Sequence, residues 1–280
     1  MVIYILGSDS YIAKRFYEKT KHRNNCKRVS RSSKDKDYSF DLIDKQSFDF
    51  NLINPKDVIL FFAAASSPDY CKENPKIAEE INVKGTSLFI KKFLEKKAKI
   101  LFFSSDGVFS GGEKTFYEES ERNPISYYGK MKLSIEKEFE NNKNVKIFRL
   151  SYIYSKQDKF SSYLEECVKK KCQVEVYPIL RNAVYIEDLV EGIDNLIINW
   201  DDWNNFSFNI CGEQLISRKE IAEIFSKNVS PLEIKIVEPG EEFFKGRPRV
   251  IKMKSHFFPE LLGRNPISIN KAMLKEYSSK

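Results

Sequence analysis

Apolar runs alternate with helical patterns along the first half of the chain. Runs of apolar residues at 2–6, 58–62 and 100–104 are nearly unbroken, and residues 145–153 form a fourth strand candidate that includes two basic residues. Apolar residues recur at helical spacing between them, at residues 11–21, 75–96 and 125–141. Continuous apolar strands are typical of a sheet buried on both faces, and strands separated by helices are typical of parallel βαβ units. The pattern predicts an α/β fold with a parallel sheet.

The regularity weakens after about residue 155. Residues 160–171 have helical spacing, and residues 182–197 and 207–225 each read as a strand followed by a helix. We therefore expect one domain over residues 1–155, joined by returning segments near residues 181–212, and a second, smaller lobe formed mainly by residues 156–280.

Composition indicates a globular protein, with 41% hydrophobic and 14% aromatic residues. The five cysteines are scattered without a Cys-x-x-Cys pair, and only two His are present, so we expect free thiols and no metal site. The first apolar run starts beside Met1, and no apolar run approaches the ~20 residues of a membrane span. We expect a cytoplasmic protein without a signal peptide.

The net charge of +7 allows two interpretations. Nucleic-acid binding is one of them. The basic residues are spread over the whole chain among 40 acidic residues, however, and form no basic block. This distribution favours a surface that attracts small anionic molecules, without a nucleic-acid partner.

The first apolar run leads into a turn, "ILGSDSYIAKRF", that is followed by a helical pattern. A turn of this kind directs helix N-terminal N–H groups at a phosphate. The three-glycine fingerprint of dinucleotide sites keeps only Gly7, because Ser10 and Ala13 occupy the later places. Ala13 is small enough for close packing, whereas Ser10 adds a Cβ beside the pyrophosphate position. A plain strand–helix connection explains the turn equally well.

The segment "KRVSRSSKDK" ends the second predicted strand. NAD sites usually offer a carboxylate here, but this chain offers Ser30, Arg31 and Ser32. A guanidinium flanked by hydroxyls suits a 2′-phosphate, which favours NADP, although a solvated basic loop is an alternative. Further along, "FFAAASS" places small residues at a strand end, where they allow either a flat cofactor or tight packing.

A possible acid–base pair follows the third apolar run. Ser105 lies at the end of that run, and Tyr128 and Lys132 follow some 20 residues later. Their spacing alone is not diagnostic, because Tyr17/Lys21 shares it. Residues four apart share a helix face, so Tyr128 pairs with Lys132, whereas Tyr127 pairs with Met131 and is expected to serve packing or substrate contact.

From residue 2 to about residue 263 the chain resembles the extended short-chain dehydrogenase/reductases. This family includes sugar epimerases, dehydratases and dTDP-4-dehydrorhamnose reductases. "FFSSDGVFSG" is similar to "STDYVFDG" of the reductases, and "NPISYYGKMKLSIE" to "P-x-x-x-Y-G-x-x-K-x-x-x-E". "NPKIAEEINVKGT", "LRNAVYIEDL" and "GRPRV" resemble three further family motifs. The chain departs from the family in its phosphate turn and at Arg249, where the family often has Gly-Asp.

The resemblance implies a doubly wound sheet of the Rossmann type with a smaller C-terminal substrate-binding lobe. It implies a catalytic triad of Ser105, Tyr128 and Lys132, in which Tyr128 donates the proton, the ammonium lowers the phenol pKa and Ser105 binds the same sugar oxygen. The expected cofactor is NADP(H), with NAD(H) open. Expected cofactor contacts are Gly7, Ser10, Tyr11, Ile12, Arg31, Asp41, Leu42, Ala63, Ala64, Ala65, Asn82, Tyr128, Lys132 and Ser151. Expected substrate contacts are Ser67, Asp106, Val108, Arg181 and Arg247.

Gly107 narrows the reaction that the resemblance implies. The dehydratases have Glu in its place, and the GDP-fucose synthases have Cys. We therefore expect a reductase of nucleotide-linked 4-keto-6-deoxyhexoses that serves polysaccharide biosynthesis. A nucleotide-sugar 4-epimerase and a non-catalytic NADP-binding sensor remain open. The resemblance also implies a homodimer through the tyrosine-bearing helix, whose exposed face is expected to carry Lys130, Glu136 and Lys137.

Overall fold

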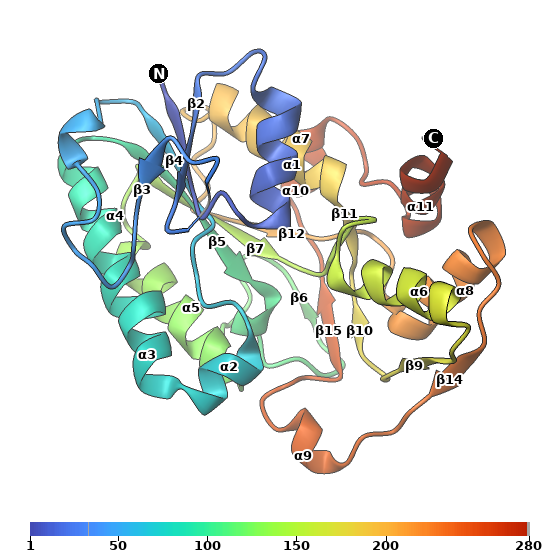
Figure 1. The fold of residues 1–280 in the computed structure, drawn as a ribbon. Helices are drawn as coiled ribbons and strands as arrows, with labels where there is room; N and C mark the ends of the chain where they lie inside the picture. The colour runs from blue at the N-terminus through green and yellow to red at the C-terminus, as the bar shows by residue number, and fades with distance from the viewer. Residues whose placement is uncertain (33, 279–280) are drawn as a thin grey trace. The chain divides into compact units, whose positions relative to one another are not determined.

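The computed structural model describes residues 1–32 and 34–278, and their contacts form two compact units (Figure 1). Unit 1 comprises residues 1–108, 126–149 and 196–208, and unit 2 comprises the rest of the described chain. Each unit is thus assembled from segments that are far apart in the sequence. The boundary near residue 155 stays a prediction.

Unit 1 is built on a seven-stranded sheet. In spatial order its strands are β12 (Ser207–Ile210), β7 (Val145–Leu150), β5 (Lys99–Ser105), β4 (Val58–Phe61), β1 (Ile3–Leu6), β2 (Cys26–Ser30) and β3 (Tyr38–Ser39). The pairs β1–β2, β1–β4, β4–β5 and β2–β3 are parallel, as the continuous apolar runs predict. The order reverses between β1 and β4, and ligands of such sheets bind outside the carboxyl ends of the strands at this point.

Helices cover both faces of this sheet, which confirms the doubly wound fold. Figure 1 shows α1 on one side and α4 and α5 on the other. The helical segments of unit 1 are α1 (Tyr11–Thr20), η1 (Phe50–Leu52), α2 (Pro68–Glu73), α3 (Pro75–Glu79), η2 (Glu80–Gly85), α4 (Thr86–Glu95), η3 (Asp106–Val108) and α5 (Tyr127–Phe139). The helix predicted over residues 75–96 contains a π-helical turn, η2, that the sequence pattern did not reveal.

Serine caps set where two of the helices begin. Ser10 Oγ accepts a hydrogen bond from the N–H of Ala13 at 3.2 Å, and Ser126 Oγ accepts one from the N–H of Gly129 at 2.8 Å. Such caps satisfy N–H groups that have no partner inside the helix. The cap at Ser126 explains why α5 begins at Tyr127, two residues later than predicted.

The core of unit 1 is rich in phenylalanine. Phe50 lies with its ring centroid 5.4 Å from that of Phe48 and 5.2 Å from that of Phe93, and Phe48 and Phe93 are buried. Each fully buried aromatic side chain contributes about 1.5–3 kcal/mol to folding. These contacts fix helix α4 against the sheet and its connecting loops.

Unit 2 contains a four-stranded sheet in the order β13 (Ile216–Ser217), β10 (Leu180–Arg181), β15 (Val250–Met253) and β6 (Thr115–Phe116). Two parallel strand pairs join β8 (Ile153–Tyr154) to β11 (Val184–Tyr185) and β9 (Val174–Val176) to β14 (Ile234–Ile236). Its helices are α6 (Lys159–Lys170), α8 (Arg218–Asn228), α9 (Glu241–Phe244), α10 (Phe258–Leu262) and α11 (Ile269–Ser278), and α7 (Ile186–Ile198) links the two units. The strand predicted over residues 145–153 is split here into β7 and β8.

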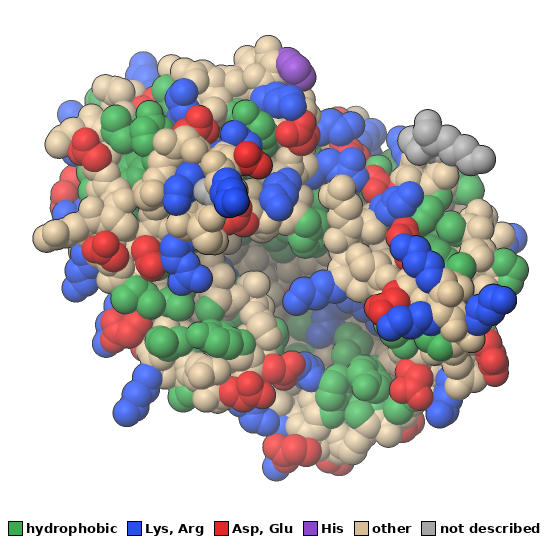
Figure 2. Space-filling model, in the orientation of Figure 1, with side chains coloured by type: hydrophobic (Ala, Val, Ile, Leu, Met, Phe, Trp, Pro, Cys, Tyr) green, Lys and Arg blue, Asp and Glu red, His purple; other side chains and the backbone are tan. Residues whose placement is uncertain are grey.

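Among the described residues, no helix has the length and apolar character needed to cross a bilayer. On the face drawn in Figure 2, Lys and Arg side chains are interspersed with Asp and Glu. This mixture agrees with the even spread of charges in the sequence.

Candidate active site

A cavity of about 600 Å³ lies in unit 1 at the carboxyl ends of β1, β2 and β4. This is the place where parallel sheets of this order bind ligands. The structure brings eight of the predicted cofactor or substrate residues to its lining: Gly7, Arg31, Asp41, Leu42, Ala63, Ala64, Ala65 and Ser67. Ser10, Tyr11 and Ile12 form the start of α1 and are outside the lining, as are Asn82, Ser105, Tyr128 and Lys132.

Gly7 is required by the close approach of two strand ends. Its φ is +79°, and a Cβ at this position would lie 2.7 Å from Ala63 N and 2.8 Å from Ala63 Cα. Ala13 is fully buried in α1, as predicted from its small size. The small residues thus allow tight packing beneath the cavity while leaving space above it, which fits a flat dinucleotide.

The charged residues of the cavity include one that the sequence analysis missed. Ser30 Oγ donates a hydrogen bond of 2.5 Å to Asp9 Oδ2, which places the Asp9 carboxylate next to Arg31 in the cavity lining. Arg31 Nη1 lies 4.0 Å from Asp41 Oδ2. Parallel pairing of β1 with β2 brings the turn after Leu6 beside Ser30, so the strand ends alone could have indicated Asp9. The cavity therefore offers one guanidinium and two carboxylates.

Asn82 holds the loop that follows β4. Its Oδ1 accepts from Ala65 N at 2.9 Å, and its Nδ2 donates to Ala65 O at 3.0 Å. Cys71 Sγ donates to the same carbonyl oxygen at 3.2 Å. Asn82 is buried within the π-helical turn η2, and such turns are frequent at functional sites. Its amide supports the cavity wall, and its expected contact with the cofactor stays a prediction.

The triad residues lie where α5 packs against β5 and η3. Ser105 Oγ accepts from Gly107 N at 3.0 Å and donates to Asp106 Oδ1 at 3.1 Å. A Cβ on Gly107 would lie 3.4 Å from Ser105 Oγ, which is ordinary contact, so Gly107 directly adjoins the serine. Asp106 is buried, and so is Val108.

The Lys132 ammonium does not lower the pKa of the Tyr128 phenol below its ordinary value, as had been expected. Lys132 Nζ donates a 2.8 Å hydrogen bond to Phe103 O, and it lies 5.7 Å from the centroid of the Tyr128 ring. Burial raises the pKa of the Tyr128 phenol, and the nearby Cys71 and Asp106 act in the same direction. The prediction that the ammonium lowers this pKa is wrong, because desolvation of the phenol outweighs the attraction of the amine.

Burial also lowers the pKa of the Lys132 amine, from 10.5 to about 8, although Glu136 and Cys71 oppose this shift. The amine is therefore charged below about pH 8 and loses its charge above that value. Its charge state responds to pH near neutrality, whereas the phenol stays protonated.

One further expectation about α5 needs correction, and another stays open. Glu136 was expected on the exposed face, but it is fully buried, because it lies one helical turn beyond Lys132 on the same face. Tyr127 was expected to serve packing or substrate contact, and its contact with substrate stays a prediction. Its side chain is 39% exposed, and its hydroxyl lies 3.4 Å from Glu79 Oε2.

The remaining predicted residues belong to unit 2. The guanidinium of Arg181 donates to the backbone carbonyls of Leu180 at 2.7 Å and Pro248 at 2.9 Å, so it fastens β10 to the neighbouring segment. Arg247 stacks on the ring of Phe243 at 4.5 Å. Ser151 Oγ is buried and has no hydrogen-bond partner among the described residues. Their contacts with cofactor or substrate stay predictions.

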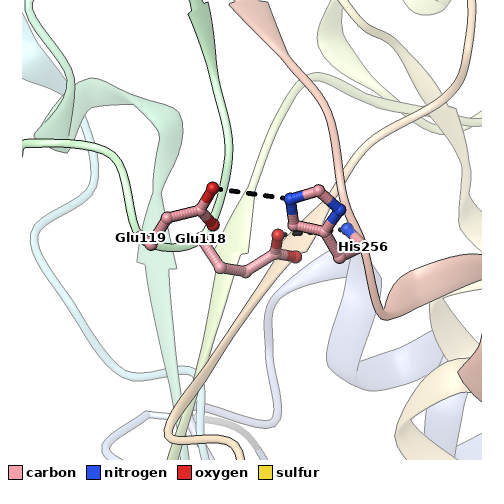
Figure 3. A group of neighbouring side chains, drawn as sticks. All are labelled: Glu118, Glu119 and His256. Atoms are coloured by element: carbon pink, nitrogen blue, oxygen red, sulfur yellow. Dashed lines mark hydrogen bonds and ion pairs between the residues drawn. The ribbon is translucent and has the colours of Figure 1, made fainter.

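Unit 2 also groups Glu118, Glu119 and His256, as Figure 3 shows. His256 Nε2 lies 3.4 Å from Glu119 Oε1, and both side chains are exposed. The buried Glu118 already accepts hydrogen bonds from Asn209 N, Ser255 Oγ and His256 N. These bonds account for its burial without an ion.

Comparison with known proteins identifies relatives over part of the chain. Methionine adenosyltransferase 2 subunit beta of Bos taurus is 33% identical over 103 residues, which cover 36% of this chain and 31% of the relative. The dTDP-4-dehydrorhamnose reductase of Salmonella typhimurium is 31% identical over 124 residues, which cover 43% of this chain and 41% of the relative. The matches thus span well under half of either relative.

Solved structures match the fold over nearly the whole chain. MoeE5 in complex with UDP-glucose and NAD has a TM-score of 0.84 at 16% identity, covering 99% of this chain and 98% of that chain. A dTDP-4-dehydrorhamnose reductase from Clostridium acetobutylicum has a TM-score of 0.83 at 22% identity, with the same coverage. The UDP-glucose 4-epimerase of Thermotoga maritima has a TM-score of 0.82 at 20% identity, covering 99% and 97%.

The family resemblance noted in the sequence is confirmed. The model of the RmlD substrate binding domain matches residues 1–241, which include both the cavity and the Ser105, Tyr128 and Lys132 residues. The chain therefore belongs to the RmlD substrate binding domain family.

Proposed function

We propose that the protein reduces a nucleotide-linked 4-keto-6-deoxyhexose to the corresponding 6-deoxy sugar nucleotide, with Tyr128 as the proton donor. The protonated phenol of Tyr128 carries this proposal, because burial raises its pKa. A neutral phenol is the form that donates a proton to a sugar oxygen as the carbonyl is reduced. Similarity to the Salmonella reductase supports the substrate class.

The proposed reaction balances with the chain's own residues and one bound reduced dinucleotide. Held by the residues that line the unit 1 cavity, such a dinucleotide would supply a hydride to the carbonyl carbon. Tyr128 transfers its proton to the carbonyl oxygen, and the resulting phenolate takes a proton from solvent. The Ser105 hydroxyl, oriented by the N–H of Gly107, binds the same oxygen when it turns away from Asp106. Lys132 binds the nicotinamide ribose, as the resemblance implies.

The dinucleotide fits the cavity by its place in the sheet and by its small lining residues. Arg31 supports NADP(H), whereas the carboxylates of Asp9 and Asp41 support NAD(H) by accepting ribose hydroxyls. We favour NADP(H) and keep NAD(H) as the alternative. Arg181 and Arg247 are the proposed contacts of the substrate diphosphate. A cytoplasmic homodimer that serves polysaccharide biosynthesis completes the proposal.

Two other functions are alternatives to this reduction. A 4-epimerase first removes a proton from a sugar hydroxyl and needs a phenolate, which the raised pKa of Tyr128 disfavours. A cofactor-binding subunit without turnover is the second candidate. It is favoured by the similarity to methionine adenosyltransferase 2 subunit beta, a protein named as a subunit of another enzyme.

Absorbance of the reduced nicotinamide tests the proposal directly. The protein is mixed with NADPH or NADH and an enzymatically generated dTDP- or GDP-4-keto-6-deoxyhexose. We expect stoichiometric oxidation that Tyr128→Phe reduces by about 100-fold or more and that Tyr17→Phe, a control with the same spacing to a lysine, leaves unchanged. Interconversion of UDP-sugars without net oxidation would establish the epimerase. Cofactor binding without either reaction would establish the binding subunit.

A further inference from the structure

The buried Glu136 is the inner end of a polar stripe on α5. Tyr128, Lys132 and Glu136 are spaced four residues apart and therefore share one face of the helix. Across from this stripe, Lys132 Nζ donates to Phe103 O at 2.8 Å, and Ser104 Oγ donates to Glu136 Oε1 at 2.5 Å. The two residues that precede Ser105 in β5 are each tied to one residue of the stripe.

Arg149 of β7 forms a buried ion pair with Glu136. Its Nε lies 3.1 Å and its Nη2 2.9 Å from Glu136 Oε2, and the two side chains are 2% and 0% exposed. A buried ion pair adds little stability over an apolar pair of similar volume, because desolvation of both charges opposes their attraction. Stability alone therefore gives no reason for a carboxylate at this position.

We propose that Glu136, held in place by Arg149 and Ser104, is a positioning residue that fixes Lys132 at the end of β5 and supplies the negative charge that keeps its amine protonated. The groups around Lys132 agree with this role. They are the Phe102 ring at 4.4 Å and the Phe103 carbonyl on β5, Cys71 on α2, and Tyr128 and Glu136 on α5 itself.

The balance of effects on the amine supports the same role. Burial lowers the pKa of Lys132, and Glu136 is the largest influence that raises it. Loss of the carboxylate would remove this influence and would leave the Arg149 guanidinium without its buried partner. Lys132 would then lose its proton closer to neutral pH.

An NMR titration of the Lys132 ¹³Cε resonance tests the proposal without substrate or cofactor. The resonance is assigned by its loss in Lys132→Met, and its midpoint in the unaltered protein is expected at about pH 8. Glu136→Gln is expected to lower this midpoint by about one pH unit. Glu138→Gln is the matched control on the same helix, because Glu138 binds Ser87 and Lys91 instead, and it should leave the midpoint in place. An unchanged midpoint in Glu136→Gln would overturn the proposal.

A second variant distinguishes the loss of the Glu136 charge from a loss of folding. Glu136→Met combined with Arg149→Met removes both charges and keeps the volume filled, so it is expected to fold. Its Lys132 midpoint should also be lower than that of the unaltered protein, and a midpoint that stays at the original value would reject the proposed electrostatic role.

The role of Glu136 depends on the proposed function only where it concerns the effect of Glu136 on the rate of reduction. In an active enzyme, Glu136→Gln should lower kcat more than it raises KM and should shift the alkaline limb of the pH profile with the NMR midpoint. Absence of turnover in the unaltered protein would reject the proposed function, while the NMR midpoints would still decide the role of Glu136.

Discussion

Lys132 directs its ammonium at the carbonyl oxygen of Phe103, 2.8 Å away, so its hydrogen bond goes to the strand end and not to Tyr128. The two residues share a helix face, yet they differ in their response to burial. The phenol is held in its neutral form and the amine is brought close to losing its charge. Under the proposed function, the proton donor and the pH-sensitive group are therefore different residues of the same stripe.

The pH dependence of reduction follows from this difference. The pKa of Lys132 is lowered to about 8, so its ammonium is present below that pH and is lost above it. The pKa of Tyr128 is raised, so the phenol keeps its proton across the same range. We expect kcat/KM to fall as pH rises through about 8, measured by steady-state kinetics from about pH 6 to about pH 10. Lys132→Met should remove this limb, and a flat profile in the unaltered protein would contradict the assignment.

Asp9 is predicted to weaken binding of the 2′-phosphate of NADPH. Two unit charges about 4 Å apart interact by about 1 kcal/mol even at the dielectric constant of bulk water. Asp9→Asn should therefore tighten NADPH relative to NADH by about five- to tenfold, measured by titration of nicotinamide fluorescence. Arg31→Ser should act in the opposite direction, and Asp44→Asn, which lies outside the cavity, should have no effect. An unchanged NADPH to NADH ratio in Asp9→Asn would exclude this role.

Gly7→Ala is expected to destabilise unit 1 by about 3 kcal/mol, because it combines a positive φ with a Cβ placed 2.7 Å from Ala63 N. Gly263→Ala is the matched control. Its φ is +68° and a Cβ there meets no atom within 4 Å, so it should cost only about 1 kcal/mol. Urea unfolding measures both, and equal losses would mean that the contact with Ala63 is relieved by small shifts.

Arg264 is predicted to stabilise unit 2 through a buried carboxylate. Its Nη2 lies 2.8 Å from Asp188 Oδ1, and the Asp188 side chain is 1% exposed. Arg264→Ala should cost about 2 kcal/mol in thermal or urea unfolding, because it leaves Asp188 without its cation. Lys235→Ala removes the exposed ion pair with Glu175 and should cost less than about 1 kcal/mol. Similar losses for the two variants would contradict the prediction.

Sequence alone predicts the sheet well, because burial on both faces leaves continuous apolar runs such as Val58–Phe61. It also locates Gly7 and the small residues after β4, since strand ends are easily recognised in the chain. The spacing of Tyr128 and Lys132 correctly places both on one helix face.

The wrong predictions concern charged and polar side chains whose surroundings come from distant parts of the sequence. Glu136 looks like a surface residue in a lysine-rich helix, because its partner Arg149 is distant in sequence and lies on another element. The pKa of Tyr128 was misjudged for a different reason, because the sequence does not show that the fold buries the phenol. Asp9 was overlooked because its partner Ser30 belongs to a different strand.

The π-helical turn η2 makes the position of Asn82 depend on the number of residues in this helix. It accommodates one residue more than a regular helix would, and each added residue rotates the rest of the helix by about 100°. Loss of a single codon within Glu80–Gly85 would straighten the helix and turn Asn82 away from the backbone of Ala65, without any substitution elsewhere. One small deletion would thus detach the cavity wall from its support while every other residue of the chain stayed the same.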